Sequence, residues 1–202
     1  MGNNYAKLVQ SNLHQIYEKR SGEELERCLP GKAEASMVSF PAFGQICRIS
    51  PEGIWLGEEK QEGVIGILLS LYALHAGPEE AVLHPLKAFK DFPHSGPYTG
   101  AFVTHTQNVL IPHVPEIGEK MSGIMEKLGG YDGPEAAGGD FSFVLWPLPK
   151  IALCYIFYEA DEDFPASVNC LYSGNASLFM PMDGLADVGE YTSAAIIRVL
   201  SE

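Results

Sequence analysis

Long runs of apolar residues separated by short breaks dominate the last third of the chain. Residues 141–146 and 151–158 are rich in aromatic and β-branched side chains, which favour strands. Pro149 lies between them, lacks a backbone N–H and restricts Leu148 to extended geometry. The pattern therefore predicts two strands joined by a tight bend, with a third strand over 166–172 that ends at a turn signal.

The amino-terminal part of the chain combines helical and strand patterns. An asparagine near the start can cap a helix over 5–19, and 23–28 adds a short helical turn before a Leu-Pro-Gly stop. Turn sequences then separate three short apolar stretches, which we expect to be strands at 35–40, 45–49 and 54–56. These strands are expected to form an antiparallel meander.

Residues 63–76 are the most hydrophobic stretch of the chain. Its 14 residues fall short of the roughly 20 that a membrane-spanning helix needs, so we expect a buried helix. Small residues at positions 63, 66, 70, 73 and 77 give it one slim face, which we expect to approach a sheet closely. Larger side chains line another face, so both sides should be covered.

The sequence signals for the remaining helices differ in strength. Residues 77–115 are dense in Pro, Gly and His and lose periodicity, although 98–110 slightly favours a helix. Pro115 then opens an amphipathic helix that Gly129 and Gly130 terminate. Asp183 is expected to cap a final helix that runs to the end of the chain.

These elements predict an α+β fold. We expect a helix and polar segment over 1–34 and a single α+β domain over 35–202. In that domain the strands near 35–56 and 141–172 form one mostly antiparallel sheet, packed against the buried central helix and the C-terminal helix.

Composition limits the classes of partner. The chain has 202 residues, 46% of them apolar, and a net charge of −13. From Leu128 onward, eleven acidic residues stand against Lys150 and Arg198 alone. Such an acidic protein repels nucleic acid and anionic membranes, and no basic stripe offsets this, so we expect neither as a partner. A protein partner or a small-molecule ligand remains open, as do the oligomeric state and any cofactor.

The cysteines indicate a reducing compartment. They are dispersed, with no C-x-x-C pair, and three of them lie in strand-like sequence. We interpret them as buried free thiols rather than as a metal or redox site. The start of the chain carries no apolar signal segment, so the expected location is cytoplasmic.

An acidic corner is the best candidate for chemistry. Glu159, Asp161, Glu162 and Asp163 follow the second strand within five residues. Crowded carboxylates raise one another's pKa and attract a hard cation such as Mg²⁺ or Ca²⁺, for which Asp161 and Asp163 are the candidate ligands. The alternative is structural, since acids at a strand end commonly face water or hold a turn.

Histidines supply the other candidate ligands. His75, near the end of the predicted buried helix, is either a site residue or a core-edge histidine that stabilises the helix end. Four more histidines have spacings that match no metal motif, and they are expected at the surface unless two converge: His84, His94, His105 and His113.

Several of these segments resemble the bacterial and archaeal family known as domain of unknown function 3786. The resemblance is carried by Leu148-Pro149-Lys150, Ile156-Phe157-Tyr158, the run from Asp161 to Ala166, and Phe179-Met180-Pro181 with the closing helix; Leu74-His75 matches more weakly. Members often occur in anaerobes, and some carry an iron–sulfur segment that this chain lacks. The chain departs from the family pattern at Leu171-Tyr172-Ser173 and at Met182-Asp183-Gly184, which weakens a shared catalytic site.

Two functional hypotheses follow. The first is a non-catalytic accessory module that binds a small ligand or a protein in anaerobic metal or cofactor metabolism. The second is a metal-assisted or acid–base enzyme built on Asp161, Asp163 and His75, which requires these residues to line one cleft. No nucleophile or phosphate-binding motif is present to favour a large enzyme class.

Overall fold

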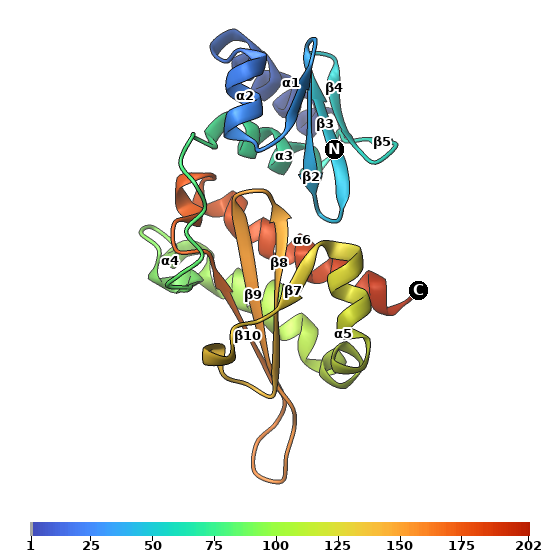
Figure 1. Cartoon of the computed structure of the whole chain (residues 1–202), viewed down its shortest axis with the longest axis vertical. Coiled ribbons are helices and arrows are strands. Elements are labelled where there is room, and N and C mark those ends of the chain that lie inside the picture. The colour runs from blue at the N-terminus through green and yellow to red at the C-terminus, as the bar shows by residue number, and fades with distance from the viewer. Residues whose placement is uncertain (1) are drawn as a thin grey trace.

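The computed structural model describes residues 2–202 as two antiparallel sheets, each with its own helices, arranged along the long axis of the molecule (Figure 1). We call these parts the amino-terminal and carboxy-terminal lobes. The α+β class is confirmed. The prediction of a single sheet is wrong, because the strands of 35–56 and of 141–172 belong to different sheets.

The amino-terminal lobe is a five-stranded meander with three helices on one face. Its strands follow chain order, β1-β2-β3-β4-β5, and every neighbouring pair is antiparallel. They are β1 (Lys32–Glu34), β2 (Met37–Ala42), β3 (Gln45–Ser50), β4 (Gly53–Leu56) and β5 (Glu59–Lys60). The helices are α1 (Gly2–Lys19), α2 (Gly22–Cys28) and α3 (Val64–His75). Alternate strand residues such as Phe40 and Ile49 are buried toward these helices, which leaves the other face of the sheet open.

The carboxy-terminal lobe is organised around a fully buried strand. Its sheet has the order β6-β10-β9-β8-β7, with β6 (Lys87–Ala88), β7 (Gly130–Asp132), β8 (Phe141–Leu148), β9 (Ile151–Tyr158) and β10 (Ser167–Tyr172). Every residue of β9 except Tyr158 is buried. Helices α4 (Gly96–Phe102), α5 (Val114–Leu128) and α6 (Met182–Leu200) are its main helical elements, and α6 packs along one face (Figure 1).

The two sheets remain separate because the first completes its pairing locally. The first sheet is built from consecutive hairpins, so its ladder is satisfied before the chain enters α3. The lobes meet where the β2–β3 turn reaches the carboxy-terminal lobe. There the Phe43 amide donates to the Pro147 carbonyl at 2.8 Å, and Gly44, at a φ of 77°, packs against the end of α5.

The slim face of α3 packs against a helix rather than a sheet, which corrects the sequence-based expectation. A Cβ at Gly66 would collide with the Gln61 carbonyl and lie 3.1 Å from Val9 on α1. Ser70 Oγ on α3 accepts a hydrogen bond from the Asn12 side chain on α1 at 2.9 Å. The small residues of α3 form a groove, and side chains of α1 pack into that groove.

The helical segment between β6 and α5 is irregular. The expected helix is present, but α4 continues into a π-helical turn over Val103–Gln107 and then a 3-10 turn over Asn108–His113. Pro112 has no N–H to offer, and this stretch is rich in β-branched residues, so regular α-helical hydrogen bonding is disfavoured.

The remaining helices begin and end near the expected positions. Helix α5 ends at Gly129, which is in the left-handed region at a φ of 72°. Helix α6 starts two residues earlier than expected, with Pro181 rather than Asp183 at the N-cap. Within residues 2–202, no helix combines the length and hydropathy that a membrane span requires.

Candidate functional site

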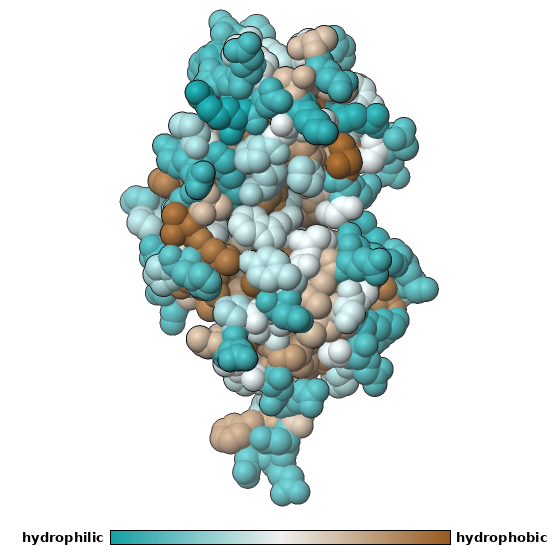
Figure 2. Space-filling model, in the orientation of Figure 1, coloured by the Kyte–Doolittle hydropathy of each residue, from teal (hydrophilic) through white to brown (hydrophobic). Residues whose placement is uncertain are grey.

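The acidic corner forms a hydrogen-bonded turn in the loop between β9 and β10, which projects from the body of the molecule (Figures 1 and 2). Asp161 Oδ1 accepts hydrogen bonds from the amides of Asp163 at 2.8 Å and Phe164 at 2.7 Å. The Asp161 amide in turn donates to the Phe164 carbonyl at 3.0 Å. Glu159, Asp161, Glu162 and Asp163 are all exposed. This geometry corresponds to the structural alternative, a turn held by a carboxylate.

His75 lies at the opposite end of β9 from the acidic corner. Lys150, just before β9, contacts Gly77, two residues beyond His75, whereas the corner follows the last residue of the strand. An eight-residue strand spans about 26 Å. His75 is exposed, and its pKa is lowered by partial burial and by the nearby Arg20 cation, with Asp183 acting in the opposite direction. The structure therefore does not bring His75 and the acidic corner into one cleft.

The other histidines do not assemble a metal site either. His84, His94 and His105 are exposed, and His113 is half-buried. Among residues 2–202, no three His, Cys, Asp or Glu side chains are placed to hold a metal ion together. A ligand-binding role for Asp161 and Asp163 stays a hypothesis.

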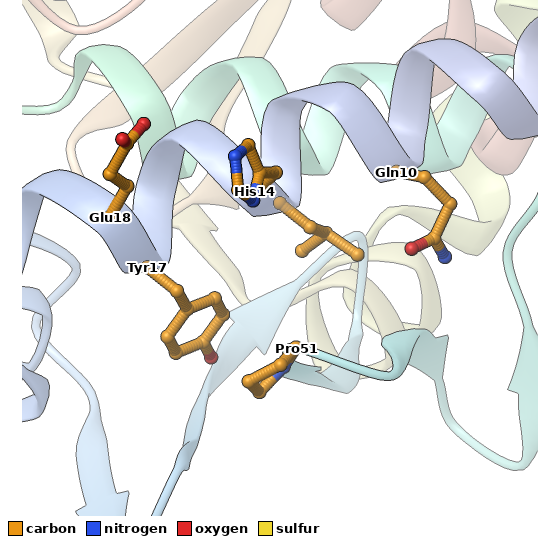
Figure 3. Close-up of a pocket in the computed structure, with 6 residues that line it drawn as sticks. Gln10, His14, Tyr17, Glu18 and Pro51 are labelled. Atoms are coloured by element: carbon orange, nitrogen blue, oxygen red, sulfur yellow. The ribbon is translucent and has the colours of Figure 1, made fainter.

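A shallow hollow of about 420 Å³ lies between α1 and the β3–β4 turn (Figure 3). The Tyr17 ring points toward Pro51, whereas the Glu18 carboxylate points away from it. The Tyr17 hydroxyl already donates to the Ile49 carbonyl at 2.8 Å. Burial, Glu52 and Cys47 raise the pKa of Tyr17 to about 12, so the hydroxyl stays protonated at neutral pH. The Tyr17 hydroxyl therefore has a structural role, as the donor of this hydrogen bond.

A second hollow of about 500 Å³ lies on the open face of the first sheet. Arg48 and Trp55 face each other across β3 and β4 there. The Arg48 guanidinium donates to the Gly57 carbonyl at 2.5 Å and to Glu58 at 3.2 Å, and Ser50 donates to Glu52 at 2.5 Å. The polar side chains of this hollow therefore largely satisfy one another.

A third hollow combines polar side chains with a wall of buried aromatic residues. It is a half-open hollow of about 340 Å³ at the edge of the second sheet, where β6 pairs with only the last two residues of β10. Three of its polar side chains, Lys90, Gln107 and Asn169, make no hydrogen bond or ion pair within the described part of the chain. Phe102 and the buried Cys170 contribute to its walls. We call it the β10 pocket.

The irregular helix shapes this pocket. Val103 and Gln107, the first and last residues of the π-helical turn, both line it. π-Helical turns are rare and frequently occur at functional sites. The turn is held against α6 at Gly189, where a Cβ would lie 2.7 Å from Phe102 and from Thr106 Oγ1 and 2.9 Å from the Tyr172 hydroxyl. Only glycine permits this approach, so α6 fixes the wall of the pocket from behind.

The electrostatics of the β10 pocket differ from those of the whole chain. Residues 92–115 contain no acidic residue, and neither does β10, in a protein of net charge −13. Lys90 is the one charged side chain in the lining, and Lys87 lies nearby on β6. Burial raises the pKa of the Cys170 thiol, so it remains protonated. The pocket thus offers hydrogen-bond donors and one cation, without a strong nucleophile.

No sequence motif marks this pocket. Its lining comes from the segment after β6, from the irregular helix and from β10, which are separated by up to about 80 residues of chain. The absence of acidic residues between 92 and 115 is the one sequence feature that could have indicated the pocket. It points to a ligand site only when the fold shows that this segment forms a pocket wall.

Comparisons with known proteins agree with the resemblance found in the sequence. The family model described as Domain of unknown function (DUF3786) matches residues 23–195. A comparison with curated proteins finds no match, and neither does a comparison with solved structures. The family match covers both sheets, the helices between them and the β10 pocket. The chain belongs to the DUF3786 family.

Proposed function

We propose that the protein is a non-catalytic binding module that holds a small ligand in the β10 pocket. The observation that carries this proposal is the convergence of Lys90, Gln107 and Asn169, whose side chains have no partner within the described chain, on one half-open hollow with a buried aromatic wall. Polar groups placed around an apolar wall fix the orientation of a ligand. The volume of about 340 Å³ is at the lower end of the range for ligand sites, which favours a compact ligand over a dinucleotide.

The chemistry of the lining supports binding rather than catalysis. The Thr99 hydroxyl donates to the Ser95 carbonyl at 3.1 Å and has no base to activate it among the residues that line the pocket. Cys170 is held as a thiol by burial, and the thiolate is the reactive form. The acid–base alternative at Glu159–Asp163 has less support, since Asp161 holds a turn and His75 lies at the far end of β9.

The cellular setting is part of the proposal. Four buried free cysteines support a reducing compartment, so we place the protein in the cytoplasm. The family's occurrence in anaerobes supports a role beside anaerobic metal or cofactor metabolism, with the bound ligand as an intermediate or signal of that metabolism.

Native mass spectrometry of protein purified without air tests the proposal. We expect a bound small molecule in the parent and in Val109→Trp, a partly exposed position on the same helical segment that does not line the pocket. Val103→Trp should lose that molecule because the indole fills the cavity. A parent without any bound molecule, or a ligand that persists in Val103→Trp, would contradict the proposed site. Matching circular dichroism spectra would show that both variants fold.

A protein partner is the second candidate, and one groove favours it. A hollow of about 390 Å³ lies between the lobes, where the space-filling surface is indented (Figure 2). Its lining includes the apolar Trp146 and Ile46 beside polar residues at its rim, and Ile46 is 56% exposed. Exposed apolar grooves commonly mark protein contacts. A photo-crosslinker at Gln45, inside the groove, should capture one defined protein, and the same group at the exposed Lys7 should not.

A further inference from the structure

We infer that the β10 pocket selects a small organic carboxylate with an apolar body. This inference rests on the proposed function and names the class of ligand. It follows from the charge of the lining, the kind of hydrogen-bonding groups and the apolar side chains beside them.

The charge of the walls favours a monoanion. The lining contains Lys90 and no acid, and 92–115 and β10 contribute no carboxylate to the surroundings. The nearest acid in sequence, Asp91, is exposed and is not in the lining. Asp187 on α6 lies near Tyr172 but outside the lining, so the lining itself carries a single positive charge, Lys90, which attracts an anion.

The hydrogen-bonding groups match a carboxylate in number and type. The Lys90 ammonium supplies donors, and the amides of Gln107 and Asn169 each add an NH₂ group. A carboxylate accepts at two oxygens and is satisfied by such a set. A phosphate dianion is a poorer match because the lining offers one cation and no arginine fork.

The apolar wall consists of aromatic and aliphatic side chains. Phe89 and Phe102, both in the lining, stack with ring centroids 4.4 Å apart and planes 12° from parallel. Val103 and Leu171 add aliphatic surface. A ring or a short branched chain attached to the carboxylate would bury its apolar surface against these side chains, which contributes about 25 cal/mol per Å².

Benzoate and its neutral analogue benzamide provide the test. Ligand-observed NMR titrations at low salt should show the parent binding benzoate about threefold to tenfold more tightly than benzamide, because Lys90 is exposed and its charge is partly screened. Lys90→Gln should abolish this preference and leave benzamide affinity unchanged. Lys32→Gln, an exposed lysine on the other sheet, should retain the preference.

The outcomes separate the ligand class from the site itself. Equal binding of the two probes, with both lost in Val103→Trp, would overturn carboxylate selection and leave the small-ligand pocket standing. A benzoate preference that survives Lys90→Gln would also overturn the inference. Benzoate binding that survives Val103→Trp would place the probe outside the pocket and contradict it. Failure of both probes on a parent that carries a small molecule in native mass spectrometry would reject the carboxylate class alone. Failure in both experiments would reject the pocket as well.

Discussion

The Lys150 ammonium donates a hydrogen bond to the Gly77 carbonyl at 2.6 Å and so ties the β8–β9 turn to the end of α3. Lys150 is only 4% exposed, and its Nζ lies 5.5 Å from the centroid of the Phe179 ring. The contact joins the two lobes beside the α3 terminus, whose last carbonyls are bound by the Arg20 guanidinium. Lys150, which belongs to the Leu148-Pro149-Lys150 segment that resembles the family, therefore has a structural role.

Replacing Lys150 with Met should lower the free energy of unfolding by about 1–3 kcal/mol, because the Gly77 carbonyl loses its donor. Urea denaturation followed by circular dichroism measures this change. Lys7→Met, at an exposed position on α1, should have little effect. Equal losses in the two variants would refute the specific role of the Lys150 contact.

The same residue gives a pH prediction. Burial lowers the pKa of Lys150 in the folded protein, partly opposed by Cys28, Glu79 and Glu80. Between the lowered value and the ordinary lysine value, the unfolded chain binds more protons, so folded stability rises with pH in that range. The advantage of the parent over Lys150→Met should therefore grow as the pH rises through this range toward the ordinary lysine pKa of about 10. An advantage that shrinks with rising pH would contradict the shift.

Gly66 tests the packing of α1 on α3. Gly66→Ala should destabilise the protein by about 1–3 kcal/mol, because the new Cβ collides with the Gln61 carbonyl and crowds Val9. Gly63→Ala is the matched control, since a Cβ there meets nothing within 4 Å. Leu at Gly66 or Ala73 should be worse for the same reason. Equal melting temperatures for the two alanine variants would count against close packing of the helices.

Asp161 and Asp163 should differ in their effect on stability. Asp161→Ala removes the acceptor for two backbone amides and should cost about 1 kcal/mol, whereas Asp163→Ala removes no such bond. Chemical denaturation measures the difference. The double change to Asn should also destabilise the domain if the turn is purely structural. A double variant that melts no lower than a parent carrying a stoichiometric divalent ion would instead make both residues metal ligands.

The four cysteines should form no disulfide and should react slowly with thiol reagents in the folded protein. All four are buried and unpaired: Cys28, Cys47, Cys154 and Cys170. Burial raises the pKa of Cys154 to about 11 and raises those of Cys47 and Cys170 as well, so little thiolate is present at neutral pH. Ellman's reagent should react slowly with the native protein and find four thiols after denaturation without reductant. Fewer than four, in the absence of intermolecular disulfides, would overturn this prediction.

Local sequence signals determined the type of most elements. The extended geometry before Pro149 and the apolar runs on either side of it predicted β8 and β9, which form a hairpin. Gly129 predicted the end of α5 because a left-handed residue there closes a helix with little steric cost. These outcomes depend on backbone restrictions and periodicities that operate within a few residues, so the sequence alone suffices for them.

Tertiary structure decided which elements meet. The small residues of α3 showed that something packs closely, but the choice of α1 over a sheet depends on contacts more than 50 residues apart, such as Asn12 with Ser70. The strand patterns were equally compatible with one sheet or two, because a strand's burial pattern shows which face is buried but not which strand pairs with it. The β10 pocket is the same case. Lys90, Gln107 and Asn169 have no local pattern in common, and only the packing of the irregular helix against β10 and Gly189 brings their side chains to one space.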